Sequence, residues 1–134
     1  MTVDRQAHTG GSLNQAIANA VVRQHRRYVG RGPSKAHAFY HHNVVMVVMD
    51  DPFTQGERSL AANGQAESVQ RLRRDFQHMM RRALIDDVEA LTGRVVDAYL
   101  GSVHLDPDIE TAVFVLDRPL ETSELPDAAA DVVA

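Results

Sequence analysis

The residues with the clearest chemical potential are three histidines in the segment 35–50. His37, His41 and His42 lie close together, and on an extended strand His37 and His41 would point to one face. A neutral imidazole binds zinc or copper and titrates near physiological pH, so this group could form a metal or proton-coupled site. Strand ends and turns tolerate histidine at little cost, and no HExxH motif is present. We therefore favour an interpretation without a metal, and keep the three residues as candidates.

Four arginines in the segment 63–93 form a second candidate site. At about 100° per residue they project from the side of a helix opposite its apolar stripe, with Arg73 nearer the flank. Such a face could bind phosphate, acidic lipid or an acidic partner surface. The same face could equally be exposed to solvent, because nearby carboxylates partly neutralise its positive charge. The candidates for partner contact are Arg71, Arg74, Arg81 and Arg82.

No sequence motif indicates a catalytic or nucleotide-binding site. The chain has no cysteine, which excludes thiol catalysis, disulfide bonds and thiolate metal sites. No serine lies in a GxSxG or SxxK context, and no Walker A or GxGxxG fingerprint occurs. We therefore expect no cofactor and assign no catalytic residue. An enzyme that uses a histidine and a carboxylate as acid and base is the least favoured alternative, because the sequence singles out no such pair.

Length and charge narrow the class of protein. The 134 residues suit one domain, and a formal net charge of −4 argues against a nucleic-acid partner. The longest apolar run, 44–49, is too short to cross a bilayer, so we expect no direct membrane insertion. The N-terminus has no hydrophobic signal segment. These features predict a cytoplasmic protein that reaches a membrane only through a protein partner.

A long helix within 63–93 is the element around which the fold is organised. Asn63-Gly64 predicts the end of a preceding helix, and Gly93 predicts the end of this one. Its apolar residues recur every three or four positions, which is typical of an amphipathic helix that needs a sheet or another helix to cover it. The predicted stripe comprises Val69, Leu72, Phe76, Met79, Met80, Ala83, Leu84, Val88 and Leu91.

Caps and periodicity predict the other elements. A helix begins at Ser12 and ends at the GRGP segment 30–33. A hairpin turns near His42-Asn43, and Thr54 with Glu57 fits a capping box for a short helix. Two strands with period-two patterns follow Gly93 and are joined by a turn at 105–108. The strand 44–49 is apolar on both faces, so its second face would be covered by the N-terminal helix or by another subunit.

The predicted order is therefore α-β-β-α-α-β-β. Two hairpins side by side give an α+β domain with a four-stranded, mostly antiparallel sheet packed by the long helix. We assign residues 1–11 to a flexible lead-in, 12–118 to this single domain and 119–134 to a disordered acidic tail.

The order and spacing of several motifs resemble a bacterial family. The motifs are GRGP, NVVMVVMDD, FTQGERSL, LTG at the end of the long helix, and VHLDPDIETAVFVL, which together cover about 12–116. This succession is similar to the YbcI-like proteins of unknown function, also labelled MpsC, a component of a sodium-translocating, membrane-potential-generating system. The resemblance implies an accessory role in cation or inorganic-carbon transport, with an integral membrane transport protein as a partner.

Two functional hypotheses follow. The favoured one is a non-enzymatic accessory or regulatory protein that forms a homodimer and acts through protein contacts, because the central strand is apolar on both faces and no catalytic constellation is present. The alternative is a small-ligand or metal-binding sensor that uses the hairpin histidines.

Overall fold

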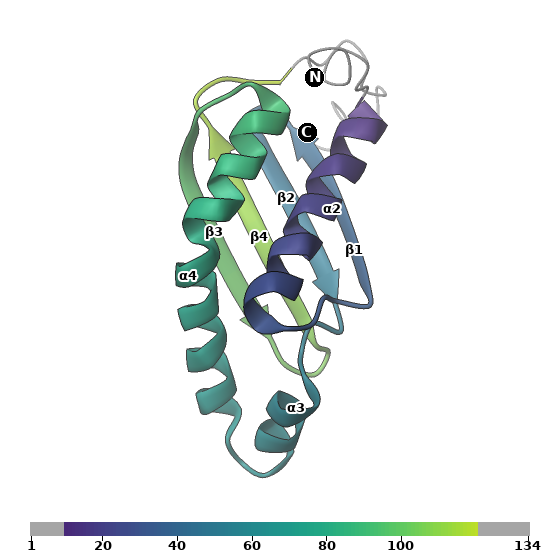
Figure 1. Ribbon diagram of the computed structural model, residues 1–134, viewed down its shortest axis with the longest axis vertical. Helices are drawn as coiled ribbons and strands as arrows, with labels where there is room; N and C mark the ends of the chain where they lie inside the picture. The colour runs from purple at the N-terminus through teal and green to yellow at the C-terminus, as the bar shows by residue number, and fades with distance from the viewer. Residues whose placement is uncertain (1–9, 121–134) are drawn as a thin grey trace, which may run out of the picture.

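Two antiparallel hairpins build the sheet of the computed structural model, which describes residues 10–120 (Figure 1). Strand β1 (Lys35–His41) turns into β2 (Val44–Asp50) through His42, whose φ is 56°. Strand β3 (Val96–His104) turns into β4 (Ile109–Leu116) through Asp106, whose φ is 57°. Both turns were predicted.

The two hairpins join through their second strands. The strand order is β1-β2-β4-β3, and every neighbouring pair is antiparallel. In the central pair Val47 lies opposite Ala112 and Met46 opposite Val113. The predicted four-stranded antiparallel sheet and the order of elements are therefore confirmed, and β2 is a central strand.

Both long helices lie on the same face of the sheet. Helices α2 (Gly10–Val29) and α4 (Ala66–Thr92) pack against one another and cover it, while α3 (Gln55–Ala62) lies beyond one end (Figure 1). One apolar core lies between this helix layer and the sheet, and it includes Ile17, Val21, Val45, Val47, Met80, Leu84, Val88 and Phe114. The N-terminal helix therefore does not cover the second face of β2, which removes one of the two predicted alternatives.

Local capping chemistry sets the ends of the helices between the two hairpins. The hydroxyl of Thr54 accepts from the N–H of Glu57, whose carboxylate accepts from the N–H of Thr54, so the predicted capping box is present. Gly93 ends α4 at φ 68°, a conformation that glycine adopts without steric cost.

The packed domain extends slightly beyond its predicted limits. Helix α2 already includes Gly10 and Gly11, and Leu120 is buried in the core with its N–H donating to the carbonyl of His42. The predicted lead-in and acidic tail otherwise lie outside the described residues.

The buried stripe of α4 differs from the predicted one in its first half. Leu72 and Met79 are exposed, whereas Arg73 and Gln77 are buried. Arg73 was predicted near the flank of the helix, and this placement is wrong, because its side chain is fully enclosed. The inward positions of α4 are Val69, Arg73, Gln77, Met80, Leu84 and Val88, spaced by three or four residues along a single face.

Candidate functional site

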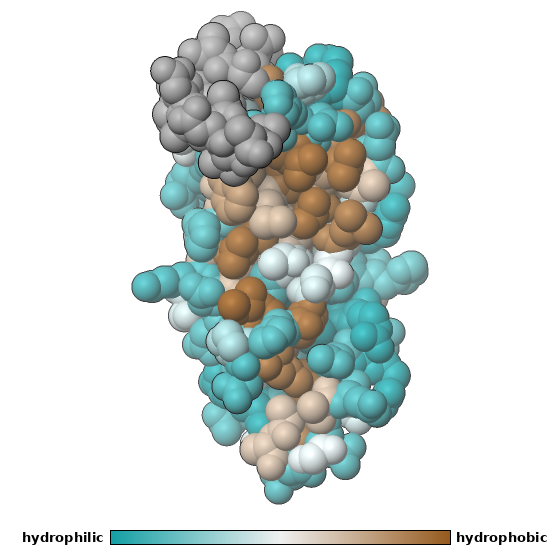
Figure 2. Space-filling view, turned by 180° about the vertical axis from the view of Figure 1, so that it is seen from behind, coloured by the Kyte–Doolittle hydropathy of each residue, from teal (hydrophilic) through white to brown (hydrophobic). Residues whose placement is uncertain are grey.

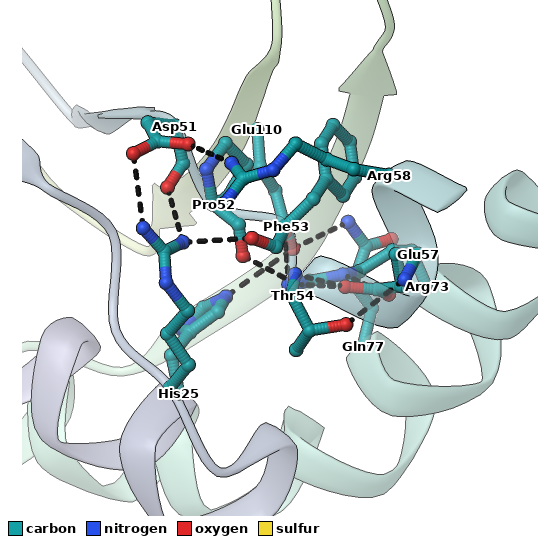
Figure 3. A network of polar contacts seen from close by, with 11 residues as sticks. His25, Asp51, Pro52, Phe53, Thr54, Glu57, Arg58, Arg73, Gln77 and Glu110 are labelled. Carbon is teal, nitrogen blue, oxygen red and sulfur yellow. Dashed lines mark hydrogen bonds and ion pairs between the residues drawn. The ribbon is translucent and has the colours of Figure 1, made fainter. Parts of the chain in front are cut away.

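A buried cluster of charged side chains is centred on Arg73 of α4 (Figure 3). Its Nε and Nη2 donate to the two carboxylate oxygens of Glu57 at 2.8 and 2.7 Å, and Nη1 donates to Oε1 of Glu110 at 3.0 Å. Nη2 also donates to the carbonyl of Pro52, and the guanidinium lies 5.1 Å from the ring centroid of Phe53. One side chain thus joins α4 to α3, to β4 and to the loop after β2.

His25 of α2 completes this cluster. Its Nδ1 is 2.9 Å from the carbonyl oxygen of Val21, and its Nε2 is 3.2 Å from Oε2 of Glu110. His25, Arg73 and the two glutamates thus meet in a region closed to solvent.

The two glutamates remain ionised despite their burial. Burial alone would raise the pKa of the Glu110 carboxyl, but hydrogen bonds from His25 and Gln77 and the charges of His25 and Arg73 lower it overall. Burial alone would also raise the pKa of the Glu57 carboxyl. Its interactions with Arg73 and with Thr54 are stronger, so the pKa is lowered overall.

A more exposed ion group continues the cluster toward solvent. Asp51, at φ 53°, accepts from Arg31 at 2.9 Å and from Arg58 at 2.6 Å, and these contacts outweigh desolvation and lower the pKa of its carboxyl. Arg31 also donates to the carbonyls of Asp51 and Phe53. Arg31 of the GRGP segment therefore anchors the loop between β2 and α3.

The enclosed geometry of the buried cluster indicates a structural role. His25 and Glu110 are a histidine and a carboxylate in hydrogen-bond contact, the pairing that acid–base catalysis would use. Both side chains are almost fully buried, and their polar atoms already bond to protein groups. A substrate atom has no approach to this pair, so the cluster holds the helices on the sheet.

The predicted histidines lie on the β1–β2 hairpin. The rings of His41 and His42 are 4.1 Å apart, and His37 stacks on Phe39 with the ring centroids 6.4 Å apart. His41 Nε2 is buried without a hydrogen-bond partner. Within residues 10–120, no three histidine, aspartate or glutamate side chains come together as a group that could hold a metal ion. Within the described residues, the metal-sensor alternative therefore lacks a group of three ligands around its candidate histidines.

The four predicted arginines divide into two kinds. Arg82 forms an exposed ion pair with Asp86 at 3.6 Å, and Arg71 donates to the hydroxyl of Ser68. Arg74 and Arg81 instead line a groove between α4 and β3. Arg71 and Arg82 are not among the residues that line this groove.

The face of the sheet opposite the helices carries a run of apolar side chains. Alternation along β2 and β4 places half of their side chains there, and Figure 2 shows hydrophobic residues running along the middle of this view. Phe39 of β1 and Leu100 of β3 are 46% and 59% exposed. The half-buried outward residues of the central strands include Val44, Met46, Val48, Val113 and Val115. We call these seven residues the open face.

Comparison with known families assigns the chain to one of them. The family model described as "Na+-translocating membrane potential-generating system (MpsC)" matches residues 9–118, which is most of the chain. The chain belongs to the MpsC family. Searches of curated proteins and of solved structures found no match to this MpsC-family chain. In its described part, no helix is long and apolar enough to cross a membrane.

Sequence reasoning missed the buried cluster of this MpsC-family chain, although two signals pointed to it. Arg73 and Gln77 continue the spacing of Val69 and Met80 along one face of α4. Glu110 occupies an inward position of β4, two residues before Ala112. A search for polar residues in phase with apolar ones would have singled out these positions.

Proposed function

We propose that this chain is a non-enzymatic accessory protein that acts through protein contacts, and that its open face binds a second copy of the chain. The observation that carries the proposal is the apolar character of the open face. An antiparallel sheet with one solvated face normally places polar side chains there. A contiguous exposed apolar patch on a protein surface marks an interaction site instead.

The distribution of charge favours a second copy as the partner. Between the ends of the two central strands, no outward position of β2 or β4 carries a charge; these positions are Val44, Met46, Val48, Thr111, Val113 and Val115. In a two-fold dimer each residue near the axis meets its own counterpart, so a central charge would repel itself. At one end of the same face the cation Lys35 lies opposite the anion Asp50 in the β1–β2 register, so their charges offset one another. Two such sheets can pack about 10 Å apart.

A membrane transport protein is the second partner that we propose, and the family name supports it. The dimer would then be a soluble-side component of a Na+-translocating system. Co-purification of the chain with detergent-extracted membranes tests this part separately. Recovery of the chain without any membrane protein would contradict it and leave the dimer proposal to its own test.

A charge on the open face should abolish the dimer. Met46 points outward from central strand β2, and Met46→Glu would place a carboxylate at the centre of the interface, where it is desolvated without a cation. We expect the wild-type chain to be a dimer at tens of micromolar and the variant to be a monomer. Sedimentation equilibrium measures both.

The matched control is Met79→Glu, the same change at an exposed position of α4 on the helix side. This variant should remain dimeric. A monomeric wild-type chain, or loss of the dimer in both variants, would remove the open face as the site of self-association.

A further inference from the structure

A polar groove runs between α4 and the free edge of β3, away from the open face. Its more enclosed part has a volume of about 220 Å³ and is lined by Gln70, Arg74, Gln77 and the β3 segment 101–103. An adjoining, more open part of about 410 Å³ is lined by Arg74, Asp75, Gln77, His78, Arg81, Tyr99 and Gly101. Arg74, Gln77 and Gly101 border both parts, so the two form one groove.

The floor of this groove is held in place by the buried cluster. The Gln77 side chain donates from Nε2 to Oε2 of Glu110 at 2.9 Å. A Cβ atom at position 101 would lie 2.8 Å from the Gln77 amide, so a larger residue there would require this side chain to move away from β3. The floor is therefore a fixed amide surface attached to the core.

The charges around the groove favour an anion. Arg74 and Arg81 lie seven residues apart on α4, about 10 Å along its axis, and no ion pair is found for either within residues 10–120. His78 lies between them on the same side, and Asp75 is the single carboxylate among the lining residues. The free edge of β3 adds main-chain N–H groups that no strand pairs.

Tyr99 adds a phenol to the lining of the open part. Burial raises its pKa, and the negative charge of Glu110 adds to that rise, while Arg81 opposes it. The phenol therefore keeps its proton at neutral pH and can donate to an oxyanion.

We propose that this groove binds a small molecule with two anionic groups, either phosphoryl or carboxylate. One group lies in the enclosed part against the Arg74 guanidinium, whose planar fork matches an oxyanion. The second group lies near Arg81 and His78 in the open part. Arg74 borders both parts and is the residue on which affinity depends most.

Calorimetric titration of the full chain with inorganic pyrophosphate, and separately with citrate, tests this proposal. Potassium chloride at matched ionic strength controls for general screening. We expect Arg74→Gln to weaken binding about tenfold or more, because a charge-assisted contact is lost. The matched control is Arg82→Gln, which removes an arginine paired with Asp86 outside the groove and should bind as the wild type does.

The outcomes separate the two kinds of anion. Binding of pyrophosphate alone that depends on Arg74 supports a phosphorylated ligand, and binding of citrate alone supports a carboxylate ligand. Failure of both probes to bind, or equal affinity in the two variants, would overturn the proposal. Neither result bears on the dimer, because the groove and the open face share no residue.

Discussion

Replacement of Arg73 by methionine should lower the free energy of unfolding by about 3–5 kcal/mol. Methionine keeps much of the buried volume of the side chain but removes its charge and its donors. Glu57 and Glu110 would then stay buried without the guanidinium that bonds to both. The carbonyl of Pro52 would lose a donor as well. Urea unfolding followed by circular dichroism measures the change, since the chain has no tryptophan.

The control for this prediction is Arg71→Met, the same change one half-turn earlier in the helix. Arg71 is exposed, and its hydrogen bond is to Ser68 on the surface. We expect a change of less than about 0.5 kcal/mol. Arg73→Lys should also be strongly destabilising, because an ammonium keeps the charge but cannot reproduce the guanidinium fork. Similar losses in the Arg73→Met and Arg71→Met variants would show that the cluster contributes little to stability.

Acid should destabilise the fold through the same cluster. The pKa values of Glu57 and Glu110 are lower in the folded chain than their ordinary value of 4.5. Below that value the unfolded chain binds more protons than the folded one, so the stability of the fold falls with pH. The contribution of each glutamate is fully present above about pH 4.5 and is lost as the pH falls through its folded-state pKa.

The Glu110→Gln variant isolates the contribution of one carboxylate to the pH dependence of stability. The amide has nearly the shape of the carboxylate but does not titrate, so the variant should be less stable near neutral pH and lose less stability on acidification. Urea midpoints measured from neutral pH to about pH 3 give both quantities. Asp86→Asn, at an exposed carboxylate paired with Arg82, should keep the wild-type pH dependence. A pH dependence of Glu110→Gln that matches the wild type would exclude this carboxylate as the source.

Local signals were sufficient for the elements and their order. The Thr54 capping box, Gly93 after α4 and the turn at His42 each depend on residues that are near in sequence, and all three are present. The central position of β2 was also predicted from its apolar residues on both faces, and the structure places it between β1 and β4. The histidine and arginine candidates were chosen from spacing alone, which brings residues near one another without showing what they bond to.

The sequence by itself determined the order of the helices and strands and that their apolar faces must be covered, because these depend on backbone conformation and periodicity over a few residues. Only the tertiary structure decided which charged side chains are buried. Arg73 and Arg74 are neighbours of one type, yet Arg73 bonds to Glu57 and Glu110, sixteen and thirty-seven positions away, while Arg74 lines the groove. The tertiary structure likewise placed α2 beside α4 and left the second face of the sheet open. The periodicity of α4 places Arg73 in phase with the apolar positions, but the partners that stabilise its buried charge meet it only when the chain folds.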